Sequence, residues 1–225
     1  MRTPVLVSDG RLRAESEGVV ARLFLASFFK DVAVLFPNFA DGACAGKKVC
    51  FIPTAALKEK MAFYVGADRK ALAKLGLDID DLEVSSASET EITNGISSAD
   101  YVFLSGGNTF FLLQELRRTG ADRLIGEHIA SGKIYIGSSA GSAVLAKNVE
   151  YMHHMDLPGA APGLDGDFAG LGVVDFCVVP HATNAPFKKA VRQVLAEYSD
   201  VLDLRPISNN QVVAVRGDAV ETLTR

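Results

Sequence analysis

The sequence predicts an α/β fold in which a mostly parallel sheet carries helices on both faces. Short apolar runs, which are typical of buried parallel strands, recur along the chain. Segments with apolar residues at helical spacing separate these runs, as expected for successive βαβ units. The last segment, residues 201–223, predicts a small closing hairpin near the C-terminus.

The first strong strand signal comes after an irregular opening. Residues 1–20 mix charge, glycine and proline without sustained periodicity, so we expect an N-terminal extension there and a single α/β domain over residues 21–225. The apolar run at 21–27 predicts the first strand. A helix-like stretch follows up to Phe39, and the apolar run at 48–52 then predicts a buried parallel strand.

Helices and strands alternate through the middle of the chain. Charged and apolar residues at helical spacing predict a helix over residues 58–75. The elements expected next are a strand at 77–84, a strand at 100–104, helices at 109–118 and 121–131, a strand at 133–136 and a helix that begins near Ala140. Residues 148–172 lack periodicity and are rich in Gly, Pro, His and Asp, as functional loops often are. A strand at 173–179 and a helix at 186–198 follow.

Composition excludes several classes of protein. The 23 basic and 27 acidic residues give a net charge of −4, so no excess of positive charge favours a nucleic-acid partner. The apolar runs are too short to span a bilayer, and residues 1–20 lack the apolar core of a secretory signal. The three cysteines lack metal-site spacing and predict no disulfide framework. We therefore expect a cytoplasmic protein without a membrane partner.

The motif most informative about chemistry is Gly137-Ser138-Ser139-Ala140-Gly141. It matches G-x-S-x-G, directly follows a predicted strand and precedes a predicted helix, which is the setting of a nucleophile elbow. In such an elbow a strained turn exposes the serine hydroxyl above the sheet. Ser139 is the central serine, and Ser138 and Ser142 are its rivals. A turn of small residues without catalytic function is the alternative.

A serine nucleophile needs a histidine base and a third group that orients the histidine. His181 follows the predicted strand at 173–179, at a strand end where ligand sites of parallel sheets gather, so it is the preferred base. His128 is expected on the surface of a helix, and His153 and His154 lie in the irregular loop. Four aspartates of the same region could orient the base, and the residues alone do not choose among them: Asp156, Asp165, Asp167 and Asp175.

A second glycine-rich turn, residues 105–110, also follows a predicted strand and opens a helix. Acyl transfer needs two N–H donors for the developing oxyanion, commonly one after the nucleophile and one from a neighbouring glycine turn. Ala140 and Gly107 fit these roles, with Gly106 as an alternative to Gly107. A phosphate-binding or purely structural turn is the competing interpretation, although the usual phosphate-loop motifs are absent.

Four ordered blocks of the sequence resemble the S51 peptidases, the group of peptidase E and cyanophycinase within the class I glutamine-amidotransferase-like fold. The blocks, which together span most of the chain, are residues 52–55 (IPTA), 106–110 (GGNTF), 137–141 (GSSAG) and 180–184 (PHATN). The resemblance implies a catalytic domain of the S51 type with a Ser139, His181 and Asp156 triad. Asp156 would orient the imidazole, although its loop is spaced slightly further from the elbow than in peptidase E.

The resemblance also implies a reaction and a substrate class. It implies cleavage of a short peptide after an N-terminal aspartate through an acyl-enzyme, without a metal or an organic cofactor. Asn108, Thr109 and Asn184 flank the expected site and are candidate substrate-binding residues. Ser138 stands where peptidase E has a large aromatic residue, which predicts a pocket of different shape. The oligomeric state stays open, with a homodimer as one alternative.

Three other functions compete with an Asp-X dipeptidase. The same triad could act on an isoaspartyl or branched peptide, a longer peptide or an ester. The domain could instead keep the amidotransferase-like scaffold for ligand binding without turnover. A glutaminase domain would need a cysteine at the elbow, where this chain has Ser139 and where Cys177 is expected inside a strand.

Overall fold

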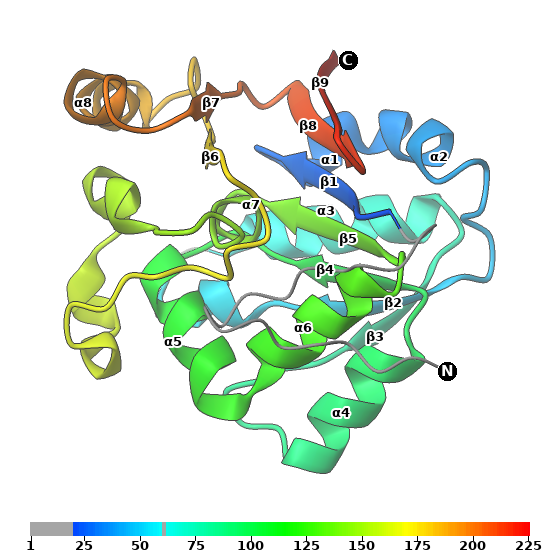
Figure 1. Cartoon of the computed structure of the whole chain (residues 1–225). Coiled ribbons are helices and arrows are strands. Elements are labelled where there is room, and N and C mark those ends of the chain that lie inside the picture. The colour runs from blue at the N-terminus through cyan, green and yellow to red at the C-terminus, as the bar shows by residue number, and fades with distance from the viewer. Residues whose placement is uncertain (1–19, 60–61) are drawn as a thin grey trace.

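The computed structural model describes residues 20–59 and 62–225 and is built around a seven-stranded sheet (Figure 1). The strand order is β3-β2-β4-β5-β1-β8-β9. The first five strands run parallel to one another, β8 pairs antiparallel with β1, and β9 pairs antiparallel with β8. The strands are β1 (Arg22–Ala26), β2 (Lys48–Ile52), β3 (Asp78–Asp81), β4 (Tyr101–Leu104), β5 (Ile134–Ser138), β8 (Gln211–Arg216) and β9 (Ala219–Thr224). The predicted α/β class, the mostly parallel sheet and the closing hairpin are confirmed.

Helices cover both faces of this sheet, as predicted (Figure 1). The helices on one face are α1 (Phe29–Val32), α2 (Phe36–Phe39) and α3 (Phe63–Lys74), and those on the other are α4 (Glu89–Ser98), α5 (Thr109–Thr119), α6 (Ala121–Ala130) and α7 (Ala140–Ala143). Short 3₁₀ helices lie at η1 (Ala33–Leu35), η2 (Thr54–Lys58), η3 (Glu150–His154), η4 (Pro158–Ala160) and η5 (Pro162–Leu164). Helix α8 (Lys188–Tyr198) lies apart from the main sheet and packs against the 3₁₀ helix η3 (Figure 1). None of the helices in the described ranges is long and apolar enough to cross a membrane.

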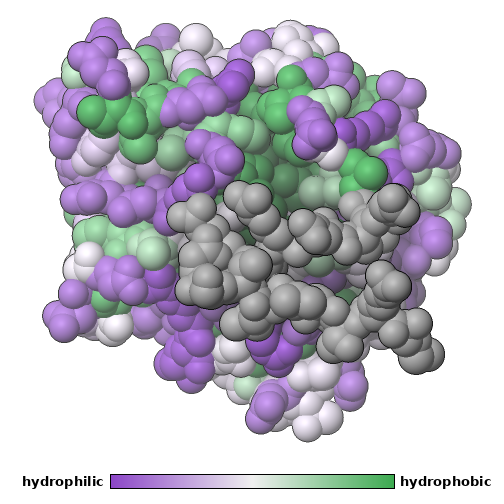
Figure 2. All heavy atoms as spheres, in the orientation of Figure 1, coloured by the Kyte–Doolittle hydropathy of each residue, from purple (hydrophilic) through white to green (hydrophobic). Residues whose placement is uncertain are grey.

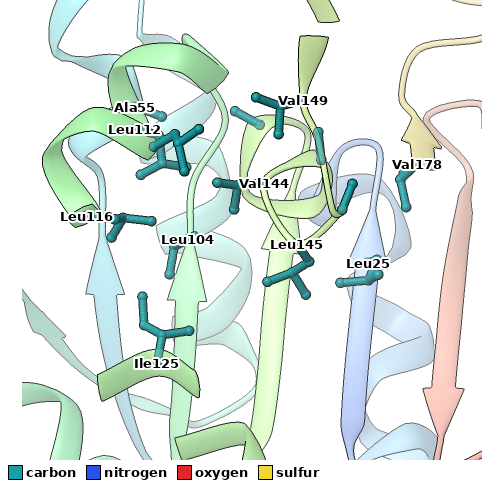
Figure 3. Packing of buried hydrophobic residues seen from close by; sticks show 14 of the residues in the cluster. Leu25, Ala55, Leu104, Leu112, Leu116, Ile125, Val144, Leu145, Val149 and Val178 are labelled. Carbon is teal, nitrogen blue, oxygen red and sulfur yellow. The ribbon is translucent and has the colours of Figure 1, made fainter. Parts of the chain in front are cut away.

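Alternating residues of the strands contribute side chains to two separate hydrophobic cores. In β1, Leu23 and Leu25 point to one core while Phe24 points to the other, because successive side chains of a strand face opposite ways. Leu25 and Leu104 pack beneath helix α5 and the segment after the elbow (Figure 3). Hydrophilic residues cover most of the visible outer face, with hydrophobic ones between them (Figure 2). The two cores hold the central strands in place, and the site is built at the ends of these strands.

The segment after the irregular loop differs from the prediction. Only β6 (Cys177–Val179) forms within the predicted strand 173–179, and it pairs with β7 (Leu204–Pro206) in a separate two-stranded sheet. The closing hairpin therefore consists of β8 and β9 alone. The predicted extension at residues 1–20 lies outside the described residues except for Val20.

Glycine is required at position 141, where the elbow helix crosses the end of β4. A Cβ atom at Gly141 would lie 2.2 Å from the Leu104 carbonyl oxygen, closer than any real contact. Gly141→Ala is therefore expected to lower the free energy of unfolding by at least about 3 kcal/mol, because the backbone must move. Urea unfolding measures the change.

Gly66→Ala is the matched control, since a Cβ atom at Gly66 in α3 meets no atom within 4 Å. That substitution is expected to stabilise the protein by about 0.5–1 kcal/mol through the helix preference of alanine. Equal stability of the two variants would contradict the close approach at Gly141.

Candidate active site

Ser139 lies on a strained turn between β5 and α7. Its φ of 52° and ψ of −108° are outside the regions that L-residues favour, as expected for the nucleophile position of an elbow. The Ser139 N–H donates to the Ala26 carbonyl at 3.0 Å, which ties the turn to the end of β1. The tight geometry presents the side chain above the carboxyl ends of the central strands.

His181 contacts the Ser139 hydroxyl. Ser139 Oγ and His181 Nε2 are 3.0 Å apart, which is hydrogen-bond distance. His181 also has a positive φ, 61°, and its ring stacks on Phe187 with the ring centroids 4.7 Å apart. The predicted proximity of these two residues is present, although His181 follows the small β6–β7 sheet and not a strand of the main sheet.

Asn209 and Ser27 hold the far side of the imidazole. His181 Nδ1 is 2.7 Å from Asn209 Oδ1, an acceptor, so the proton lies on Nδ1 and Nε2 is free to accept from Ser139. Ser27 Oγ donates to Asn209 Oδ1 at 2.9 Å and accepts from the His181 N–H at 2.8 Å. The network therefore sets the tautomer that a general base needs.

Burial and hydrogen bonding act on His181 in opposite directions. Burial lowers the pKa of the imidazole below its usual 6.5, and the hydrogen bond to Asn209 raises it in part. Asn209 carries no charge, so it orients the ring without the attraction that a carboxylate would exert on an imidazolium. A lowered pKa keeps the ring neutral, and so able to accept a proton, at neutral pH.

Asp156 does not have the predicted position beside His181. Its Oδ2 accepts from the Thr109 N–H at 2.9 Å and from Thr109 Oγ1 at 2.5 Å, while Asn209 and Ser27 contact the imidazole Nδ1. The carboxylate thus caps the first turn of α5, where the helix dipole favours negative charge. Burial raises the pKa of Asp156 to about 6, although the two hydrogen bonds lower it in part.

The three predicted substrate-binding residues have different surroundings. Asn108 lines the pocket, but its Oδ1 caps α5 through the Phe111 N–H at 2.9 Å. Thr109 is fully buried with both polar groups on Asp156, so the prediction of substrate contact is wrong for it. Asn184 Oδ1 accepts from the Asn209 N–H at 2.9 Å, which makes it a support for the Asn209 loop.

The predicted oxyanion donors lie on the two glycine-rich turns beside Ser139. A Cβ atom at Gly106 would lie 3.2 Å from Ser139 Cβ, so the two turns are in contact. Gly107 has a φ of 140°, a conformation that favours glycine. Among the residues the structure describes, the N–H groups of Gly107 and Ala140 find no hydrogen-bond acceptor. Both remain available to a ligand atom.

A pocket of about 640 Å³ opens over Ser139. Its walls are mostly apolar, and the charged side chains that line it are Lys58, Glu59 and Asp156. The apolar and uncharged lining includes Phe28, Phe63, Tyr64, Met152, Met155, Leu157, Ala160, Pro186 and Phe187. A volume of this size fits a small organic molecule or a short peptide.

The family comparison agrees with this geometry. The model of peptidase family S51 matches residues 23–223. The chain belongs to peptidase family S51. An uncharacterized peptidase of Listeria innocua is 48% identical to this S51 peptidase over 200 residues, which cover 89% of this chain and 95% of that protein. Peptidase E of Shewanella baltica is 34% identical over 165 residues, which cover 72% of this chain and 66% of that protein.

A solved structure extends the likeness to the whole fold. A crystal structure from Listeria monocytogenes, described as a candidate peptidase E protein, superposes with a TM-score of 0.88 and 44% identity. The match covers 92% of this chain and all of that one. The S51 peptidase described here therefore has the predicted amidotransferase-like α/β fold, and its family membership makes it a peptidase.

Sequence reasoning missed two groups on the imidazole of this S51 peptidase. The apolar run at 21–27 predicts Ser27 as the end of the first strand, and Asn209 lies in the polar run 208–210 before β8. A polar residue at the carboxyl end of a central strand was the available signal for Ser27. No sequence signal points to Asn209, because only the folded chain brings it to the imidazole, by way of the β6–β7 pairing and the hydrogen bond to Asn184. The predicted surface position of His128 is wrong, since the residue is buried and its ring contacts the Ile134 carbonyl.

Asp68, a third missed residue, is a buried carboxyl group behind the elbow of this S51 peptidase. Its Oδ1 accepts from the Lys30 N–H at 2.8 Å, and its Oδ2 has no hydrogen-bond partner among the described residues. Burial raises the pKa of Asp68 from 3.8 to about 7, against smaller opposing effects of Ser138 and Lys30. Ser138 of the elbow accepts from the Phe29 N–H at 3.2 Å, so Asp68 and Ser138 bind neighbouring N–H groups of α1.

The raised pKa predicts how pH affects stability. Between about pH 4 and pH 7 the folded chain keeps a proton on Asp68 that the unfolded chain loses, so stability falls as pH rises through this window. Asp68→Asn cannot ionise and is expected to raise the free energy of unfolding at pH 8 by about 2–4 kcal/mol. Urea unfolding from pH 4 to pH 8 measures both effects.

Asp156 contributes a decline of the same sign, but it is present in the native protein and in the Asp68→Asn variant and cancels in their difference. Asp218→Asn, an exposed change in the β8–β9 turn, is the control and should behave as the native protein does. An Asp68→Asn variant with the native pH slope would show that the carboxyl group is not held protonated.

Proposed function

We propose that this S51 family member is a cytoplasmic serine-type peptidase that hydrolyses short peptides through an acyl-enzyme. The observation that carries the proposal is the 3.0 Å contact between Ser139 Oγ and His181 Nε2, at a strained elbow that opens into a pocket. A ligand-binding domain without turnover would not need a hydroxyl held against an imidazole of fixed tautomer.

In the proposed mechanism, His181 Nε2 takes the Ser139 proton as Oγ attacks the scissile carbonyl carbon. The N–H groups of Gly107 and Ala140 stabilise the oxyanion of the tetrahedral intermediate. The intermediate collapses when His181 returns the proton to the leaving amine, which leaves an acyl group on Ser139. His181 then deprotonates a water molecule that attacks the acyl carbon, and it returns that proton to Ser139 Oγ as the acyl C–O bond breaks, which releases the free acid and restores the hydroxyl.

Asn209 takes the place in this mechanism that Asp156 has in the predicted triad. Asn209→Ala removes the acceptor that holds the Nδ1 proton of His181. Such a hydrogen bond is worth about 1–3 kcal/mol, so we expect kcat to fall by roughly ten- to a hundredfold.

Asn209→Asp is the matched variant. It keeps an acceptor oxygen and should retain more activity than Asn209→Ala. Its negative charge should also raise the pKa of His181 and move the acidic limb of the pH profile to higher pH. Native activity and an unchanged pH profile in both variants would show that Asn209 does not position His181.

The carboxylates of the pocket suit the N-terminus of a short peptide. Glu59 and Asp156 both line the pocket, and either could bind the α-ammonium group of a substrate whose carbonyl carbon reaches Ser139. Burial holds the pKa of Asp156 at about 6, so this group is mostly ionised at neutral pH. This arrangement favours peptides with a free amino end.

An N-terminal aspartate is the proposed substrate residue, as the family resemblance implies. Its side chain needs a cation, and Lys58 is the basic residue among the described pocket lining. Lys58 Nζ lies 4.8 Å above the Phe111 ring. The apolar walls favour an alternative, in which the N-terminal side chain is neutral and Lys58 has no part in binding.

Release of free N-terminal amino acid from a panel of dipeptides tests the proposal. Asp-Leu, the uncharged isostere Asn-Leu, and Leu-Leu separate the substrates, and Ser139→Ala provides the blank. An Asp-X peptidase cleaves Asp-Leu fastest and loses that preference in Lys58→Gln. Faster cleavage of Leu-Leu would overturn the aspartate preference but keep the peptidase. No cleavage of any peptide by folded protein would favour another acyl substrate or a binding function.

A further inference from the structure

A cluster of metal-ligating side chains lies outside the proposed catalytic groups. His153 and His154 end η3, and Glu197 lies in α8, which packs against η3. One ligand atom from each of the three residues lies within 4.8 Å of the others. The imidazoles are 33% and 19% exposed and the carboxylate 48%, so an ion from solution can reach them.

The distances are close to those of a tetrahedral ion site. His154 Nε2 is 2.7 Å from Glu197 Oε2, and His153 Nε2 is 4.0 Å from the same oxygen. Ligand atoms at Zn²⁺ bond lengths of about 2.0–2.1 Å lie roughly 3.3 Å apart in a tetrahedron. The two observed distances bracket that value, and all three ligand atoms lie within 4.8 Å of one another, so adjustments of up to about 1.5 Å would bring them around one ion.

A backbone carbonyl already orients His153 for this role. His153 Nδ1 is 2.9 Å from the Glu150 carbonyl oxygen, which can only accept, and 3.4 Å from the Tyr198 hydroxyl, so the shorter contact favours a ring proton on Nδ1. The lone pair of Nε2 then faces Glu197. Histidines that bind metals typically donate their other N–H in this way. At His154 the proton that Nε2 shares with Glu197 would have to move to Nδ1 through solvent, which leaves a neutral ring whose Nε2 lone pair is free for the ion.

We propose that His153, His154 and Glu197 form a Zn²⁺ site. Two imidazoles and one carboxylate suit a borderline ion such as Zn²⁺ and do not suit Ca²⁺ or Mg²⁺, which prefer oxygen ligands. Water fills the fourth position. The expectation that catalysis needs no metal is unaffected, because this site holds none of the groups around Ser139.

The site connects two walls of the pocket. The segment that carries both histidines continues into Met155 and Asp156, which line the pocket. The helix that carries Glu197 begins directly after Phe187, which stacks on His181. An ion bound between η3 and α8 would therefore restrain both walls and reduce the local unfolding of the two segments.

Equilibrium dialysis of the chelator-treated full chain against Zn²⁺ alone tests the site. About one Zn²⁺ per monomeric chain is expected, with no comparable uptake of Ca²⁺. His154→Ala and Glu197→Gln should each weaken Zn²⁺ binding by at least roughly tenfold, while Glu127→Gln, a change in an exposed ion pair on α6, should not. Circular dichroism verifies that each variant is folded.

A second measurement tests the restraint. Zn²⁺ should slow amide hydrogen exchange in residues 150–157 and 188–198 of the native chain and leave the His154→Ala variant unchanged. Failure to take up stoichiometric Zn²⁺, equal uptake by His154→Ala, or uptake that requires two chains in sedimentation would each overturn the proposal. None of these outcomes depends on peptidase activity, so the site and the proposed function can fail separately.

Discussion

Ser139→Ala is expected to lower kcat for peptide hydrolysis by roughly a thousandfold or more. The substitution removes the oxygen that lies 3.0 Å from His181 Nε2, and no acyl-enzyme can form without it. The pocket and the proposed oxyanion donors remain, so KM should change much less than kcat. The free energy of unfolding should move by less than about 1 kcal/mol, because alanine and serine meet similar strain at this φ.

Ser142→Ala is the matched control for Ser139→Ala. Ser142 is the rival serine one helical turn away, and its Oγ donates to the Ala26 carbonyl at 2.7 Å, inside the protein. Its loss should cost stability of about 1 kcal/mol through one buried hydrogen bond and leave kcat close to native. Full activity of Ser139→Ala, or loss confined to Ser142→Ala, would show that the nucleophile is assigned to the wrong serine.

His181→Ala is expected to lower kcat as strongly as Ser139→Ala, by roughly a thousandfold or more. Without the imidazole, the hydroxyl keeps its proton at neutral pH and is a poor nucleophile. The variant that combines Ser139→Ala with His181→Ala should be no less active than either single variant, because the two residues act as one unit. Additive losses would indicate that the two side chains work separately.

The pH profile gives an independent check on His181. The base must be neutral, and burial lowers its pKa, so activity should persist below pH 6.5 and fall only as the ring is protonated at lower pH. The rate of acylation between pH 4 and pH 8 measures this limb. A limb above pH 6.5 would contradict the neutral, buried imidazole.

Most of the sheet was predictable from the sequence because its strands are local signals. The apolar runs around β1, β2, β4 and β5 are buried on both faces, and such runs differ visibly from the helical spacing of α5 and α6. The segment before β6 was not predictable in the same way. Val173, Val174 and Phe176 are apolar, but they precede β6 and pack on the core as irregular chain.

The parts of the site that a motif specifies were predictable, and the parts that depend on tertiary contacts were not. The G-x-S-x-G pattern specifies the turn at Ser139 by itself, and a histidine at a strand end is a recognisable partner. Asp156 and Asn209 are both polar residues in loops, and only the folded chain shows which of them reaches His181 Nδ1. Asp68 could not be identified for the same reason, since the spacing of residues in the predicted helix does not distinguish a buried aspartate from an exposed one.

Activation of Ser139 by His181 can be tested by labelling with a small organophosphonate that reacts with activated serine hydroxyls, followed by peptide mass mapping. It needs no knowledge of the substrate. About one adduct per chain is expected, located on Ser139, and it should be absent from the folded His181→Ala variant. Labelling of another serine, or equal labelling of Ser139 with and without His181, would contradict a nucleophile activated by that histidine.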